Sequence, residues 1–90
     1  AAVFACNFTN HMYALAQELL DDYGLPFDVM LPLIDETTQK VHRLSPKQAQ
    51  TGPAARGDKK VMDAHRKMLA DKPQLECIYQ LLSDSIEKMK

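Results

Sequence analysis

The sequence predicts an all-α fold, a small bundle of four main helices and one short helix. Apolar residues recur three and four positions apart along most of the chain, which is the period of a helix. No segment alternates apolar and polar residues for long enough to form a strand. Glycines and prolines fall between the periodic segments. Ninety residues are enough for one small domain and too few for two, so a single domain over residues 1–90 is expected.

The first helix is expected at about residues 1–23, and Gly24 suits the position that ends it. No charged residue occurs from Ala1 to Gln17, but polar residues interrupt this stretch, which disfavours a membrane span or a signal peptide. We therefore expect a helix buried on most faces, either at the centre of the domain or under a partner. Because its apolar pattern starts without a capping residue, we expect the natural protein to continue upstream. The periodic apolar residues are Phe4, Phe8, Met12, Leu15 and Leu19.

The second helix is expected at about residues 27–43. Pro32 falls near its first turn, where a missing N–H group matters least. Ser45 and Pro46 have the pattern of an N-cap followed by proline at the first helical position. They predict a short helix that runs to Gln50.

The last two helices follow a segment, residues 51–58, that is expected to be a loop. Asp58 is a good N-cap for the third main helix at about residues 59–70. Pro73 starts the last helix, which continues to the end of the chain. The inward positions of the third helix are Val61, Met62, His65 and Leu69, and those of the last are Leu75, Ile78, Tyr79, Leu82, Ile86 and Met89.

Charge and reactive side chains exclude several functions. The net charge is −1, with 11 basic and 12 acidic residues, so no bulk attraction to nucleic acid or anionic membrane is expected. Cys6 and Cys77 lie among apolar residues, which favours reduced core thiols in a cytoplasmic protein. His11 has no second ligand at helical spacing, so no metal site is indicated. His42 and His65 are interpreted as surface or half-buried residues.

Arg56 is the strongest candidate for a binding residue. A guanidinium group is always charged and binds carboxylate or phosphate through a fork of N–H donors. The segment 51–58 combines this cation with a turn former, a rigid proline and a capping carboxylate, more than a simple connection needs. The structural alternative is a salt bridge from Arg56 to Asp58 or Asp63.

Four other residues are candidates for contact with a substrate or cofactor. Thr51 offers a hydroxyl, Gly52 allows positive φ or the close approach of a ligand, and Pro53 stiffens the turn. Asn7 lies on the most apolar helix, where a buried amide must find partners. It either bonds to a neighbouring helix or lines a ligand cleft.

Residues 2–8, Ala-Val-Phe-Ala-Cys-Asn-Phe, and residues 51–58, Thr-Gly-Pro-Ala-Ala-Arg-Gly-Asp, together carry a family resemblance. The chain resembles, over nearly its whole length, the C-terminal helical domain of a family of bacterial Rossmann-type proteins. These proteins are described as NADP oxidoreductases or as deazaflavin-dependent NADP oxidoreductase-like. The domain itself is classed as a domain of unknown function.

The resemblance implies a helical domain like the C-terminal domains of 6-phosphogluconate dehydrogenase and pyrroline-5-carboxylate reductase. Such a domain follows a dinucleotide-binding domain that holds NAD or NADP, closes one side of the substrate cleft and often builds a homodimer. Asn7 and the 51–58 loop would then face the nicotinamide and a small substrate. This chain lacks the nucleotide domain, so on its own it is expected neither to bind NADP through a Rossmann fold nor to catalyse hydride transfer. The alternative is a non-catalytic helical module for protein–protein interaction or dimerisation.

Overall fold

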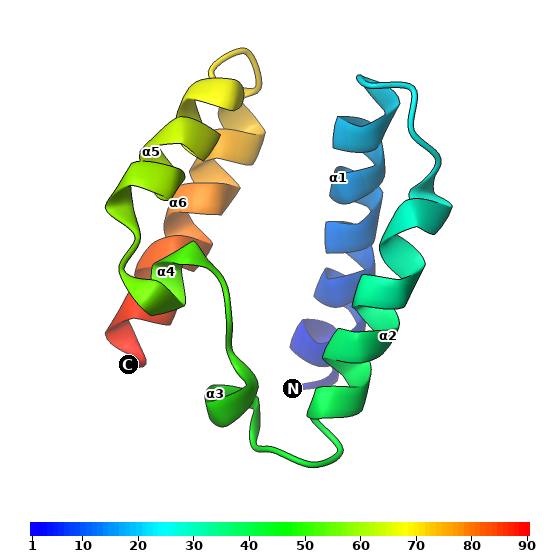
Figure 1. Ribbon diagram of the computed structural model, residues 1–90, viewed down its shortest axis with the longest axis vertical. Helices are drawn as coiled ribbons and strands as arrows, with labels where there is room; N and C mark the ends of the chain where they lie inside the picture. The colour runs from blue at the N-terminus through cyan, green and yellow to red at the C-terminus, as the bar shows by residue number, and fades with distance from the viewer. The chain divides into compact units, whose positions relative to one another are not determined.

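The computed structural model describes residues 1–90, and every regular element in it is helical (Figure 1). The predicted all-α class is confirmed. The chain divides into two compact units, residues 1–39 and residues 40–90, and each is described by itself. The expectation of a single domain stays a prediction.

The first unit begins with a continuous helical stretch whose first part is unusually wide. A π-helix, η1, covers Val3–Phe8, and α1 follows directly at Thr9–Asp21. The Thr9 hydroxyl donates to the carbonyl of Phe4 at 3.2 Å, which satisfies a backbone acceptor at the end of the wide turn. The rings of Phe4 and Phe8 meet edge to face with centroids 5.2 Å apart.

Gly24 ends this helical stretch in the predicted way. Its φ is +66°, in the left-handed region that glycine enters without steric cost. Its N–H donates to the backbone carbonyl of Asp21 at 3.1 Å, and the Leu25 N–H donates to the backbone carbonyl of Leu20 at 3.1 Å. This pair of bonds is the Schellman arrangement, and it satisfies carbonyls that the helix leaves open.

The second helix is shorter than the predicted 27–43. A 3-10 turn, η2, covers Phe27–Met30, and α2 covers Leu31–Lys40. Pro32 has no N–H to pair with the Asp28 carbonyl, and the Leu31 N–H bonds to that carbonyl instead, which tightens the first turn. Residues 41–43 form a turn.

The prediction that the first helix is buried on most faces is not met within its unit. No residue of 1–39 is buried, and Phe4 is 75% exposed. Two helices cover each other along one stripe only, so the remaining apolar surface stays open. A cover from a partner remains a prediction. The expectation that the two thiols lie in the core is wrong, because Cys6 and Cys77 are both exposed, although neither forms a disulfide.

The second unit contains two one-turn helices and a helical hairpin. The one-turn helices are α3 at Pro46–Ala49 and α4 at Pro53–Arg56. The hairpin consists of α5 at Lys59–Met68 and α6 at Pro73–Lys88. Both long helices fall where the sequence predicts them. The helix α4 lies within the segment predicted to be a loop, which corrects that prediction.

The predicted caps are present in this unit. The Ser45 hydroxyl accepts from the Gln48 N–H, and the Gln48 side chain accepts from the Ser45 N–H, both at 3.2 Å. This reciprocal pair is a capping box. Asp58 accepts from the Val61 N–H at 3.2 Å and so caps α5.

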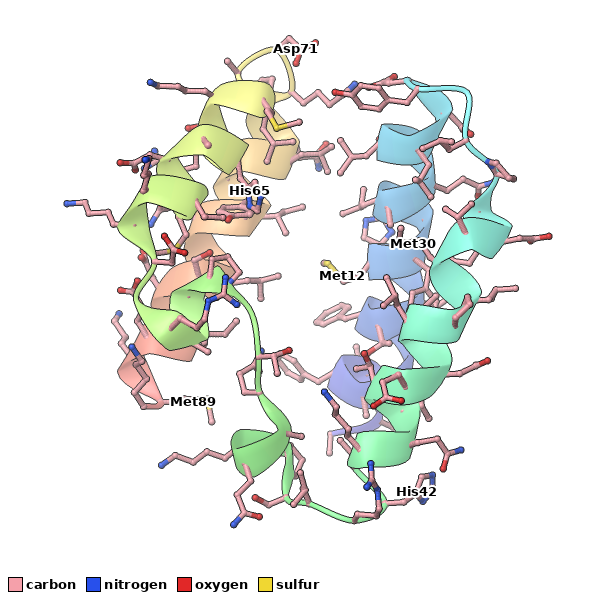
Figure 2. The ribbon with its side chains drawn as sticks, in the orientation of Figure 1. Met12, Met30, His42, His65, Asp71 and Met89 are labelled. Atoms are coloured by element: carbon pink, nitrogen blue, oxygen red, sulfur yellow. The ribbon has the colours of Figure 1, made fainter.

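The hairpin has a small apolar interior with polar ties at its edges. Leu69, between α5 and α6, is 8% exposed. Arg66 of α5 binds Glu76 of α6 at 3.2 Å, and His65 contacts the Tyr79 hydroxyl. Figure 2 shows the side chains along these two helices.

The Asp58 cap predicts a measurable loss of stability on truncation. Asp58→Ala removes the acceptor for the Val61 N–H and should cost about 1 kcal/mol of unfolding free energy. Chemical denaturation of the wild-type and variant proteins would measure it. Asp58→Asn keeps a side-chain oxygen and is the matched control. Equal losses in both variants would show that charge, rather than capping, is what Asp58 contributes.

Candidate functional site

The candidate segment, residues 51–58, is a folded turn rather than a flexible loop. Pro53 occupies the first position of α4. Ala54, the next residue, is the most buried apolar side chain of the chain at 4% exposure. The helix α4 packs against both α5 and α6 (Figure 1). The residues on either side of α4 are therefore held in place by the hairpin.

Two glycines bracket α4. Gly52, with φ +105° and ψ 170°, adopts a conformation that only glycine populates freely. Gly57 follows α4 with φ +68°. Its N–H donates to the backbone carbonyl of Ala54 at 3.3 Å, and the Asp58 N–H donates to the backbone carbonyl of Pro53 at 2.9 Å. This pair of bonds is a second Schellman arrangement. Of the two possibilities considered for Gly52, the positive φ is present, and the close approach of a ligand stays a prediction.

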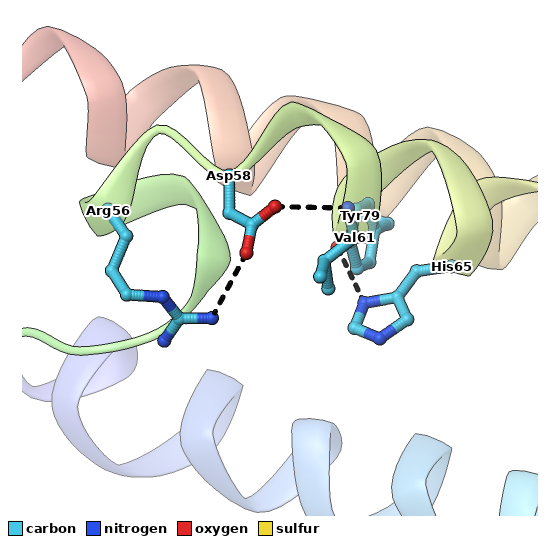
Figure 3. A network of polar contacts seen from close by, with 5 residues as sticks. All are labelled: Arg56, Asp58, Val61, His65 and Tyr79. Carbon is cyan, nitrogen blue, oxygen red and sulfur yellow. Dashed lines mark hydrogen bonds and ion pairs between the residues drawn. The ribbon is translucent and has the colours of Figure 1, made fainter.

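Arg56 makes only a loose internal contact. Its guanidinium lies 3.9 Å from the Asp58 carboxylate, and the two side chains are 60% and 36% exposed. An exposed pair at this distance contributes at most about 1 kcal/mol. Figure 3 shows that Asp58 is already engaged with the Val61 N–H. The salt bridge weighed as the structural alternative thus exists, and it leaves most of the guanidinium accessible.

The other candidates are placed as follows. Thr51 is exposed, and its carbonyl accepts from the Gln50 side chain at 2.9 Å. Pro53 is half-buried at the start of α4. Asn7 is exposed and lies in the π-helix η1 of the other unit. The helix α4 thus brings together four of the candidates, Thr51, Gly52, Pro53 and Arg56. Asn7 belongs to the first unit.

His65 and Tyr79 form a polar pair that the sequence analysis does not predict. The His65 Nδ1 lies 2.8 Å from the Tyr79 hydroxyl, with the two rings perpendicular and 5.7 Å between their centroids. Both side chains are half-buried, as predicted for His65. The sequence could have indicated this pair, because both residues hold inward positions on successive helices, and the inward faces of an antiparallel hairpin meet. Loss of solvent raises the pKa of the Tyr79 phenol above its ordinary value.

A groove of about 330 Å³ runs along another face of the hairpin. It is lined by side chains of both signs, among them Lys59, Asp63 and Arg66 of α5 and Asp84 and Glu87 of α6. These α5 residues follow a helical spacing different from that of His65, which places them on a separate side of the helix. The groove therefore does not include the His65–Tyr79 pair.

The chain has no element that would hold a dinucleotide. Dinucleotide sites use a strand, a glycine-rich turn and a helix in succession, and the structure contains no strand. The residues present therefore do not fit NADP by themselves. None of the helices combines the length and apolar character that a membrane crossing requires.

Comparisons with known proteins identify relatives. The model of a family described as a domain of unknown function, DUF2520, matches residues 1–86. A crystal structure from Bacteroides fragilis, described as a "putative NADP oxidoreductase", superposes with a TM-score of 0.94 at 67% sequence identity. The match covers 97% of this chain and 34% of the Bacteroides fragilis chain, so this chain spans about a third of that protein. No curated protein matches the sequence.

The conformation of Gly52 predicts a strain effect. Gly52→Ala should destabilise the protein by about 2 kcal/mol, because alanine rarely adopts this region of φ and ψ. No atom lies within 4 Å of the added Cβ, so the effect would come from the backbone alone. Gly24→Ala, at φ +66°, is the control and should cost about 1 kcal/mol. Thermal unfolding of both variants would show whether this order holds.

Proposed function

Because the chain belongs to the DUF2520 family, we propose that it is the substrate-side and dimerisation domain of an NAD(P)-dependent oxidoreductase. The observation that carries the proposal is the likeness to the Bacteroides fragilis protein, at 67% identity and a TM-score of 0.94. That chain is about three times as long as this one, which leaves room for a dinucleotide-binding domain. In such an enzyme, the cofactor supplies the redox chemistry, and the helical domain contacts the substrate and excludes water.

The ordered turn around α4 supports a role in substrate binding. The Arg56 side chain is 60% exposed and its guanidinium is only loosely paired, so the cation is available to an anionic group. The burial of Ala54 and the conformations of Gly52 and Gly57 hold the backbone beside it in one position. A preorganised cation of this kind binds with a smaller loss of conformational entropy. Arg56 is the residue proposed to bind the substrate, with Thr51, Gly52 and Pro53 lining the approach.

The π-helix around Asn7 supports the same assignment for the first unit. π-Helical turns are uncommon and occur frequently at functional sites. Here the π-helix contains Asn7 and leaves its amide exposed, with no hydrogen bond that would give it a structural task. We assign Asn7 a contact with the substrate or with the nicotinamide amide.

Exposed apolar side chains support dimerisation. On α6, Leu81 is 72% exposed, Leu82 46%, and Met89, just after the helix, 62%. Helical spacing places Leu82 and Met89, seven positions apart, on one stripe, and Leu81 lies beside that stripe, about 100° around the helix. In the first unit, Phe4 and Phe8 are 75% and 50% exposed. Contiguous apolar surfaces of this kind mark association sites in soluble proteins. The same surfaces favour the second candidate, a non-catalytic interaction module.

Cofactor titration separates the two functions. NADPH is titrated into the full-length protein and into residues 1–90, with binding followed by fluorescence. We expect saturable binding to the full-length protein and none to the 90-residue chain, because the strand and glycine-rich turn lie outside it. NADH in parallel reports the cofactor preference. If neither nucleotide binds the full-length protein, the oxidoreductase assignment fails and the interaction module becomes the better account.

A single charge on α6 tests dimerisation. We expect the full-length protein to be a dimer by light scattering after size exclusion, and Leu81→Asp to shift it toward monomer. The charge would have to be desolvated in a buried contact, whereas in the monomer it sits in water. Glu87→Lys, in the groove on another face of α6, is the control and should remain dimeric. A wild-type monomer at micromolar concentration would refute dimerisation.

A further inference from the structure

The His65–Tyr79 pair presents one imidazole nitrogen as a free donor. Nδ1 is 2.8 Å from the tyrosine hydroxyl, whereas Nε2 has no partner in the chain. The rings are perpendicular, so the contact is directional rather than a stack. Figure 3 shows the imidazole projecting from α5 with Nδ1 toward Tyr79.

When the Tyr79 phenol donates to Nδ1, it selects the tautomer of the histidine that carries its proton on Nε2. A phenol keeps its proton near neutral pH, and desolvation raises the pKa of the Tyr79 phenol further from that range. A protonated phenol that donates to Nδ1 leaves the ring proton of a neutral imidazole on Nε2. The charged imidazole also carries a proton on Nε2, and then Nδ1 donates to the phenol oxygen. In both of these forms, Nε2 carries a proton and can donate a hydrogen bond.

Arg56 lies on the same side of this unit as His65. Asp58 contacts Arg56 and caps α5 at Val61, which is one helical turn before His65. Figure 3 shows the Arg56 and His65 side chains directed to the same side of the α4–α5 segment. From Asp58 to His65 the rise along the helix is about 10 Å. A cation and a neutral donor at this spacing suit a small molecule with oxygens at both ends.

We propose that Arg56 and His65 together bind a small organic anion, Arg56 its carboxylate or phosphate group and His65 Nε2 a second oxygen. Tyr79 acts as a positioning residue that keeps the proton on Nε2. This inference rests on the proposed function and deepens it, because it gives the substrate class as an oxygen-rich anion several bonds long. It requires no chemistry from a cofactor.

Nuclear magnetic resonance of the full-length protein with ¹⁵N-labelled histidine tests the pair. Above the titration range of imidazole, we expect the His65 signals of the Nε2–H tautomer, and a mixture of tautomers in Tyr79→Phe. The probe is 2-oxoglutarate, which has a carboxylate at each end. It should shift the His65 Nε2 resonance and leave that of His42 unchanged. A His65 resonance that does not respond to the probe would overturn the proposal.

Variants separate binding from folding. His65→Asn keeps an acceptor near the position of Nδ1 for Tyr79 and loses the outward donor, whereas His65→Gln places an amide near Nε2. We expect Arg56→Ala and His65→Asn to weaken 2-oxoglutarate binding about tenfold or more, which is the effect of losing a charge-assisted hydrogen bond. His65→Gln should lose less, and His42→Asn nothing. Wild-type affinity in His65→Asn, with the fold intact, would refute the role of Nε2.

Inorganic phosphate in a parallel titration distinguishes a site for any anion from one that needs two separated oxygen groups. Phosphate should compete with 2-oxoglutarate at Arg56 without moving the His65 Nε2 resonance, and a shift by phosphate alone would contradict the two-point geometry. NADPH affinity, measured on the same samples, should be equal in the wild type and in the His65 and His42 variants. Failure of NADPH to bind the wild type would reject the proposed function, while the response of His65 still decides the anion site.

Discussion

The packing of one small side chain, Ala54, sets the geometry on which the rest of the candidate site depends. Because Ala54 is 4% exposed, the one-turn helix α4 lies close against α5 and α6. A larger residue there would overpack the contact and displace the backbone. Gly52 and Gly57 let the chain enter and leave that contact in conformations that other residues resist. The positions of Thr51, Arg56 and Asp58 follow from it.

Within this frame, each polar residue has a separate task. Asp58 caps α5 through one carboxylate oxygen and touches Arg56 only loosely through the other, so the cap is its closer contact. Arg66 and Glu76 tie the far end of the hairpin, at 3.2 Å. That arrangement leaves Arg56 as an accessible cation and His65 as an oriented donor. These are the two groups on which the proposed substrate-side role relies.

The exposure of the apolar residues follows from the length of the helices and from how few helices pack together. Helices of 10 to 16 residues, such as α2, α5 and α6, are marginally stable in isolation. They gain most of their stability when an apolar face packs against another element. A hairpin covers one stripe of each helix, and residues such as Phe4 and Leu81 remain open at 75% and 72%. A larger assembly is the ordinary way to cover them, which agrees with a chain that spans 34% of its solved relative.

The sequence by itself determined the helical class, the long helices and the caps, because these depend on local spacing and on single residues such as Gly24, Ser45 and Asp58. It also indicated Arg56 as a candidate binding residue, because a cation close to glycines and a proline can be recognised within a few consecutive residues. Only the tertiary structure decided that Pro53–Arg56 is a helix, that Cys6 and Cys77 are exposed, and that His65 meets Tyr79. Those outcomes depend on which helix faces pack against each other. Helical periodicity predicts which face of a helix is apolar, but it does not predict which other helix covers that face.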